Sequence, residues 1–283
     1  MTATITALVK AVPLAEGAGV TVHRTIGTPS LRHLDPFLML DHFGSDNPHE
    51  YIAGFPDHPH RGFITLTYML DGHLQHRDSM GNQGDLEAGG IQWMKAASGV
   101  IHSEMPQQTA GLMRGFQLWI NLPAAEKMSD PVYQEFSAAA IPEVVSPGCR
   151  TRVISGTLDG NKGPIDDPHT DVTYFDVALE AGAAFTHHFE PDMSAFVYAY
   201  EGSGTLAGET LPTHALAALS GGDPLTVQAR DALRFILVAG RPLREPVVQH
   251  GPFVMNSREE IEQAFADYRD GKLVQKRAAW VSD

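Results

Sequence analysis

Two short segments carry histidine and glutamate residues at the same spacing. His58 and His60 are separated by one residue, and so are His102 and Glu104. Side chains two residues apart on a β-strand point to the same side, so each pair would face a common space. If the two strands are neighbours across a small barrel, three imidazoles and one carboxylate meet there.

Such a ligand set would bind one transition-metal ion and leave room for water or a substrate. Three neutral imidazoles and a carboxylate suit Fe, Mn, Ni, Cu or Zn, and geometry and supply decide between these ions. The competing interpretation is that the pairs are ordinary polar residues, since a lone His-x-His motif more often has no metal and a lone His-x-Glu is weaker still. The occurrence of both pairs together favours the metal site.

The composition is typical of a soluble, turn-rich protein. The 283 residues are enough for two domains. With 20 basic and 34 acidic residues the formal net charge is −14, and no run of Lys or Arg offers a patch for a phosphate backbone, so we expect no direct nucleic-acid binding. The single cysteine, Cys149, excludes an intrachain disulfide.

We expect a cytoplasmic location without a membrane span. Residues 1–11 lack the long apolar core of a secretion signal. No stretch of the chain reaches the roughly 18 apolar residues that a transmembrane helix needs.

Short segments rich in β-branched and aromatic residues recur between Gly, Asp and Pro residues, which predicts an all-β fold. These segments are 62–70, 90–94, 115–122, 172–179, 195–200 and 233–239. Helical periodicity is found only near the end of the chain. There Ser257 and Glu260 form a capping box and Gly271 is placed to end a helix, so one helix is predicted over 257–270.

A weak internal repeat indicates two related domains. The segment 68–72 (YMLDG) is echoed by 198–202 (YAYEG), each after a hydrophobic run and before a turn. A polar stretch near Pro123 to Pro131 is a suitable boundary. We therefore expect an N-terminal metal-binding domain, a C-terminal domain without metal, and a final segment whose helix packs back on the first domain, at residues 1–125, 131–250 and 251–283.

The second domain offers an incomplete ligand set. The offset of the repeat matches His58 and His60 to His188 and Glu190, but the strand that should answer His102 and Glu104 lies in 233–237, which has no ligand. Two ligands rarely hold a metal ion. We predict an empty C-terminal barrel, with His187 and His188 as ordinary polar residues.

The segments around the ligand pairs closely resemble the pirin family of the cupins. The similar segments are 55–63 (FPDHPHRGF), 92–94 (QWM), 102–106 (HSEMP), 242–246 (PLREP) and 251–256 (GPFVMN). The resemblance extends in order from about residue 15 to residue 273. It implies two cupin barrels (double-stranded β-helices, or jelly rolls) in tandem with a C-terminal helix, and one iron ion bound in the N-terminal barrel by His58, His60, His102 and Glu104.

The same resemblance implies quercetin 2,3-dioxygenase activity, with a flavonol and O2 as substrates. Iron is the expected ion, with Mn, Ni, Cu, Co or Zn as alternatives. Glu104 would be the catalytic residue and accept the proton of the flavonol 3-hydroxyl. Candidate substrate-binding residues are Phe55, Trp93, Met94 and Gln117, although strand alternation predicts that Trp93 and Met94 do not both face inward.

One position departs from the family pattern. Many pirins have Glu four residues after the second histidine, where this chain has Ile64. That position is not thought to bind metal in pirins, so the ligands are retained and their surroundings become more apolar.

Two other functions are compatible with the sequence. One is a metal-dependent redox sensor that acts through a protein partner, as the nuclear co-regulator role of animal pirins suggests. The other is an oxygenase whose substrate is a different enolisable aromatic molecule.

Overall fold

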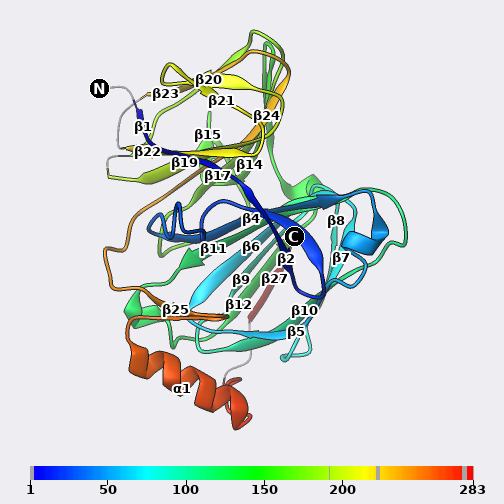
Figure 1. Cartoon of the computed structure of the whole chain (residues 1–283), viewed down its shortest axis with the longest axis vertical. Helices are drawn as coiled ribbons and strands as arrows, with labels where there is room; N and C mark the ends of the chain where they lie inside the picture. The colour runs from blue at the N-terminus through cyan, green and yellow to red at the C-terminus, as the bar shows by residue number, and fades with distance from the viewer. Residues whose placement is uncertain (1–2, 191, 221–223, 276–278, 283) are drawn as a thin grey trace. The chain divides into compact units, whose positions relative to one another are not determined.

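The computed structural model describes residues 3–190, 192–220, 224–275 and 279–282. Within these residues the chain is built mostly from β-strands, with one α-helix near its end (Figure 1). It forms two compact units, and neither is a single stretch of sequence. The N-terminal unit comprises residues 13–24, 37–140 and 243–283, and the C-terminal unit comprises residues 1–12, 25–36 and 141–242.

The observed units differ from the linear domains expected from the sequence. Strand β1 (Thr4–Lys10) pairs antiparallel with β22 (Ala215–Ser220), so the beginning of the chain belongs to the C-terminal unit. This pairing satisfies backbone groups that would otherwise lie free at the edge of the sheet. Residues 243–283 belong to the N-terminal unit.

Two β-sheets form most of the N-terminal unit. The strands of the larger sheet, in spatial order, are β2 (Val12–Glu16), β3 (Val20–Arg24), β4 (Phe37–Ser45), β11 (Met113–Asn121), β6 (Phe63–Asp71), β9 (Ile91–Lys95), β12 (Val132–Phe136) and β27 (Ala279–Ser282). Those of the smaller sheet are β5 (Phe55–His60), β10 (Val100–Pro106), β7 (His73–Asp78) and β8 (Gln83–Glu87). Short 3₁₀ helices lie at Pro48–Glu50, Ala124–Glu126 and Ala138–Ala140.

Apolar side chains from both sheets pack together inside the N-terminal unit. Burying a large apolar side chain contributes roughly 1.5–3 kcal/mol, so this contact holds the two sheets face to face. The shared core consists of Val20, Val22, Phe43, Tyr51, Met69, Leu74, Leu86 and Met113.

The C-terminal unit also consists mainly of two sheets around one apolar core. Its larger sheet contains β1, β22, β19 (Ser194–Glu201), β24 (Leu233–Gly240), β17 (Thr173–Leu179), β14 (Cys149–Ser155) and β13 (Glu143–Ser146). Its smaller sheet contains β18 (Ala184–His187), β23 (Leu225–Ala229), β20 (Gly204–Leu206) and β21 (Glu209–Leu211). A separate short hairpin joins β15 (Thr157–Leu158) to β16 (Asn161–Lys162).

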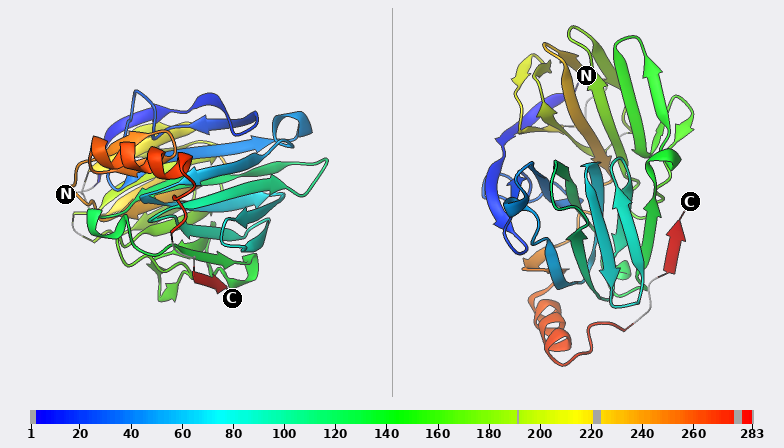
Figure 2. Two further views of the ribbon diagram at one scale, coloured as in Figure 1. Left: turned by 90° about the horizontal axis from the view of Figure 1, so that it is seen from below. Right: turned by 90° about the vertical axis from the view of Figure 1, so that its right-hand side faces the viewer.

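The predicted helix is confirmed as α1 (Arg258–Arg269), with Ser257 as its N-cap and the complete capping box formed with Glu260. Its buried residues Ile261 and Ala264 pack on the hairpin of β25 (Val248–His250) and β26 (Phe253–Met255). Both views of Figure 2 show the helix beside this hairpin. The sequence correctly located this helix because capping and amphipathic periodicity are local signals.

A close backbone contact joins the end of β5 to β26. Gly62 has φ +89°, and a Cβ atom at this position would lie 1.9 Å from the carbonyl oxygen of Val254. The Val254 amide donates to the Arg61 carbonyl over 3.0 Å. Only glycine allows the two segments to approach this closely.

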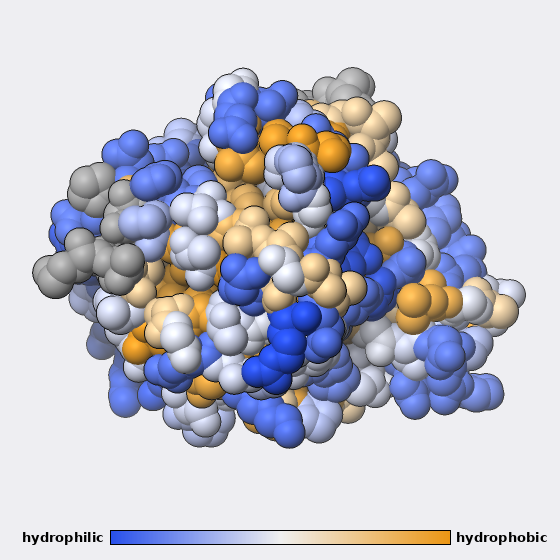
Figure 3. Space-filling model, turned by 90° about the horizontal axis from the view of Figure 1, so that it is seen from above, coloured by the Kyte–Doolittle hydropathy of each residue, from blue (hydrophilic) through white to orange (hydrophobic). Residues whose placement is uncertain are grey.

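No helix in the described part of the chain is long and apolar enough to cross a membrane. On the face of the molecule seen in Figure 3, hydrophobic residues are interspersed with hydrophilic ones.

Gly62→Ala should destabilise the protein more than Gly111→Ala. Both glycines have a similar positive φ, +89° and +91°, but the nearest atom to an added Cβ at Gly111 lies 3.9 Å away. The unfavourable φ alone costs about 1–2 kcal/mol. Overpacking against Val254 should add about 1–3 kcal/mol in Gly62→Ala only. Denaturant unfolding measures the unfolding free energy of both variants. Equal losses of unfolding free energy would show that the close contact with Val254 does not contribute to stability.

Candidate metal centre

Strands β5 and β10 are antiparallel neighbours, and their register places His58 directly opposite His102. His60 lies opposite Val100 in the same ladder. Facing residues of adjacent strands point to the same side of a sheet, so the three histidines share one face. A register shift between His102 and Glu104 changes the direction of the strand locally, and Glu104 pairs with Phe55.

The three imidazoles converge. His58, His60 and His102 each offer a ring nitrogen, and these atoms all lie within 4.8 Å of one another. The ring centroids are 4.4 Å apart for His58 and His102 and 5.0 Å apart for His60 and His102. Among the residues that the structure describes, no other group of three His, Cys, Asp or Glu side chains meets in this way.

Burial keeps two of these imidazoles neutral. His60 and His102 are 3% and 2% exposed. Burial lowers the pKa of His60 and that of His102 well below 6.5, and the neighbouring His58 ring lowers both further. A neutral imidazole has a lone pair for a metal ion, so these residues can bind one near neutral pH without first losing a proton.

Hydrogen bonds indicate which nitrogens are available. His58 Nδ1 is 2.8 Å from the Pro56 carbonyl oxygen, so it donates there and leaves Nε2 free. His60 Nδ1 and His102 Nε2 are buried and have no hydrogen-bond partner among the described residues. Buried polar atoms are nearly always partnered in folded proteins. Each of the three imidazoles therefore has at least one ring nitrogen without a hydrogen-bond partner among the described residues, and the convergence of the three rings fits a bound metal ion.

Glu104 lies outside the histidine group and is held from the larger sheet. Its Oε1 is 3.1 Å from Thr67 Oγ1, and its Oε2 accepts a hydrogen bond of 3.0 Å from Gln117 Nε2. Thr67 and Gln117 face each other on β6 and β11, and Thr67 Oγ1 is also 2.9 Å from Gln117 Oε1. A carboxylate has about four acceptor positions, so Glu104 keeps lone pairs for a proton or a metal ion.

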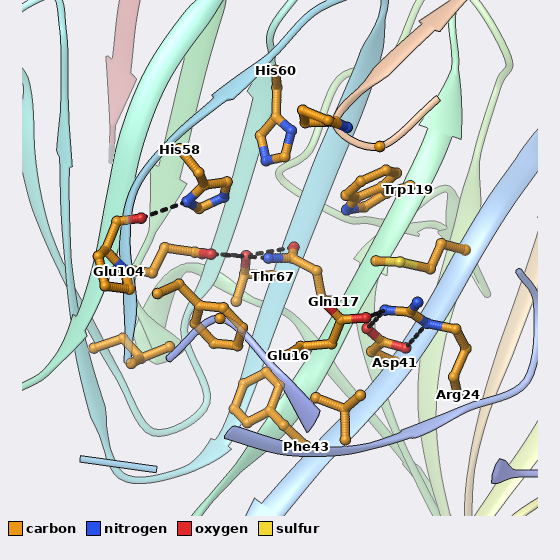
Figure 4. Close-up of a pocket in the computed structure, with 18 of the residues that line it drawn as sticks. Glu16, Arg24, Asp41, Phe43, His58, His60, Thr67, Glu104, Gln117 and Trp119 are labelled. Carbon is orange, nitrogen blue, oxygen red and sulfur yellow. Dashed lines mark hydrogen bonds and ion pairs between the residues drawn. The ribbon is translucent and has the colours of Figure 1, made fainter. Parts of the chain in front are cut away.

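These residues open on a cavity of about 600 Å³ within the N-terminal unit. Its size is within the usual range for small-molecule sites, about 300–1,000 Å³. Figure 4 shows His58 and His60 on one side, the Arg24–Asp41 pair on the other and Gln117 between them. Apolar walls are supplied by Val22, Met39, Phe43, Leu74 and Trp119.

Only two of the four predicted substrate-binding residues line this cavity. Phe55 and Gln117 do, whereas Trp93 and Met94 do not. Trp93 is 2% exposed, and Met94 packs in an apolar cluster with Tyr133. Strand β9 is buried along its whole length, between β6 and β12. Trp93 and Met94 lie away from the cavity because both faces of β9 are covered by protein.

An ion-paired group at the far side of the cavity was missed by the sequence analysis. Arg24 donates to both carboxylate oxygens of Asp41, over 2.7 and 2.6 Å, and lies 2.7 Å from Glu16. Arg24 faces Asp41, and Asp41 faces Gln117, on successive strands of the larger sheet. Burial raises the pKa of Asp41, and Arg24 opposes this effect. The available signal was a charged residue, Asp41, within the apolar run 37–43.

The C-terminal unit presents a different environment at the corresponding positions. His187 contacts the rings of Phe175, Phe185 and Phe189. His188 and Glu190 are exposed. The absence of a metal ion from this barrel stays a prediction.

Comparisons with known proteins agree with this architecture. Residues 19–120 match the family model described as Pirin, and residues 174–274 match the Pirin C-terminal cupin domain. The chain is 49% identical over 268 residues to a "Pirin-like protein" of Caulobacter vibrioides, covering 94% of this chain and 97% of the relative. It is 48% identical over 269 residues to a "Putative quercetin 2,3-dioxygenase" of Pseudomonas aeruginosa, covering 92% and 94%.

A solved structure has the same fold along nearly the whole chain. The crystal structure of a quercetin 2,3-dioxygenase from Acinetobacter baumannii superposes with a TM-score of 0.91 at 30% identity, covering 97% of this chain and 99% of that chain. The predicted pair of cupin domains is therefore confirmed.

The metal-free protein should lose stability as the pH falls below 6.5. Unfolded histidines titrate near 6.5, whereas the pKa values of folded His60 and His102 lie well below it. Between these values the unfolded state binds more protons than the folded state, so acid favours unfolding. Denaturant titrations above and below pH 6.5 measure the loss. The double variant H60N/H102N should lose less unfolding free energy over the same pH range. If its stability depends on pH as steeply as that of the wild type, His60 and His102 are not the groups responsible.

Proposed function

This chain belongs to the pirin family of the cupin superfamily, and on that basis we propose that it is a metal-dependent dioxygenase that cleaves flavonols, as a quercetin 2,3-dioxygenase does. One observation carries the proposal: two buried, neutral imidazoles, His60 and His102, converge with His58 beside a small-molecule cavity that also contains a fixed carboxylate. The names of two similar proteins, one of them solved, support the substrate class.

The residues for the metal ion are His58, His60 and His102, with Glu104 as the fourth ligand. We propose iron, with Mn, Ni, Cu, Co or Zn as alternatives, because imidazole and carboxylate ligands accept all of these ions. When bound, the ion would supply Lewis-acid and redox chemistry toward an enolisable hydroxyl and O2.

Glu104 is the proposed catalytic residue. Gln117 Nε2 and Thr67 Oγ1 hold its two carboxylate oxygens, and the unused lone pairs can accept the proton of the flavonol 3-hydroxyl. General-base assistance of this kind contributes roughly 10²–10⁴ in rate. Phe55 and the other apolar wall residues would hold the aromatic rings and exclude water from the reacting oxygen.

Glu104→Gln and His60→Ala should separate proton transfer from metal binding. Glu104→Gln has nearly the same size and can still hydrogen-bond to Thr67 and Gln117, so we expect most of the metal to remain. The variant lacks the general base, so turnover should fall by roughly 10²–10⁴. His60→Ala removes a ligand and should lower metal occupancy itself. Metal analysis is made beside assays of flavonol absorbance and CO release after anaerobic reconstitution. Equal metal loss in both variants would make Glu104 a ligand only.

The wild-type protein decides between the candidate functions. It is reconstituted separately with Fe, Mn, Ni, Cu and Co and then given O2 and flavonol. Turnover with at least one ion supports the dioxygenase. Tight metal binding without turnover by any ion, together with oxidation-dependent capture of a protein partner, would reject it in favour of the redox sensor.

A further inference from the structure

Strand β10 has a second histidine-bearing neighbour. β10 lies between β5 and β7, so His102 faces His58 on one side and Asp78 on the other. His76 is opposite Glu104 in the same β7–β10 ladder. His76 and Asp78 therefore point to the same face of the sheet as the three converging imidazoles.

A continuous buried contact leads from His102 to Asp78. His102 Nδ1 is 3.4 Å from His76 Nδ1, and His76 Nε2 is 3.5 Å from Asp78 Oδ2. His76 is 1% exposed and His102 is 2% exposed, and the Asp78 side chain is 1% exposed. The three side chains are too buried for bulk water to replace the hydrogen bonds between them.

The positions of the protons follow from this geometry. Two imidazole nitrogens that face each other form a hydrogen bond only if one carries a proton and the other does not. With His102 Nε2 directed at the cluster as a ligand, its Nδ1 must carry the proton and donate to His76 Nδ1. His76 is then protonated on Nε2, where it donates to the Asp78 carboxylate.

Asp78 and His76 are each held by other parts of the fold. Asp78 Oδ1 accepts from the backbone amides of Met80 and Asn82, over 2.8 and 3.1 Å, and Oδ2 accepts from Asn82 Nδ2 over 2.9 Å. The His76 ring packs on Tyr133 with a centroid distance of 4.6 Å.

We propose that His76 and Asp78 are positioning residues that fix the tautomer and orientation of His102 and so strengthen metal binding. The inference rests on the proposed metal centre. Hydrogen bonds from a ligand histidine to an outer acceptor hold the ring and raise its basicity, and removing them typically lowers metal affinity by about 10–100-fold.

The test is the Co²⁺ dissociation constant of the wild type and four variants, measured by competition with a chromophoric chelator. The visible spectrum of the bound ion is recorded for each. His76→Phe keeps the ring packing but removes the acceptor, and should weaken binding by about 10–100-fold with a changed spectrum. His76→Asn restores an acceptor oxygen near the position of Nδ1 and should recover much of the affinity. Asp78→Asn should have a Co²⁺ affinity between those of the wild type and His76→Phe.

Tyr133→Phe is the matched control. It keeps the ring that packs on His76 and removes only the hydroxyl, which donates to Glu135 over 2.7 Å, so Co²⁺ affinity and spectrum should be unchanged. Thermal unfolding of the metal-free proteins separates loss of folding from loss of binding.

The outcomes are distinguishable. Wild-type protein that does not bind Co²⁺ would reject the metal centre and with it the proposed function. Wild-type affinity in His76→Phe, or equal weakening in His76→Phe and His76→Asn, would overturn the positioning role while leaving the centre intact. If His76→Phe does not fold, Asp78→Asn decides, because unchanged affinity and spectrum in that variant would also overturn the role.

Discussion

The antiparallel register of β5 and β10 is the constraint on which the site depends. It places His58 opposite His102, with His60 close by, in a space where a charged imidazole is unfavourable. The three rings pack at centroid distances of 4.4–5.0 Å, and His60 and His102 keep buried ring nitrogens without a hydrogen-bond partner among the described residues. A single bound cation would satisfy these nitrogens, since it would bind their lone pairs and take the place of hydrogen-bond partners.

The end of the ligand strand is held by residues far away in sequence. Arg61, which follows His60, donates to the Ser98 carbonyl over 2.7 Å and pairs with Asp267 of α1 at 2.7 Å. Lys127 Nζ donates to the carbonyl oxygens of Gly62 and Val254 over 2.7 and 3.1 Å. Burial lowers the pKa of Lys127 to about 7. Breaking either buried group's contacts would leave polar atoms unpaired, so the C-terminal segment is a structural support of the site.

Local signals in the sequence correctly predicted the all-β fold class, the α1 helix and the strand segments that carry the histidines. Spacing within a strand shows which side chains share a face, and a capping box marks a helix start. By contrast, His76 and Asp78 became significant only through the register of β7 against β10, which joins residues from different segments. Trp93 and Met94 were misjudged for the same reason, since no local pattern shows that both faces of β9 are covered.

The same limit applies to the Arg24–Asp41 pair and to strand β1. Arg24 and Asp41 face each other only because β3 and β4 are paired, and β1 joins the C-terminal unit only through β22. Long-range strand pairing is specified by the summed burial of many residues, so a short motif does not reveal it.

The most direct test of the account is a crystal structure of the protein grown with Fe²⁺, with diffraction recorded on both sides of the iron absorption edge. The account predicts one anomalous peak in the N-terminal unit at bonding distance from a ring nitrogen of each of His58, His60 and His102. A peak elsewhere, or no peak at these three nitrogens in a crystal that contains iron, would contradict it.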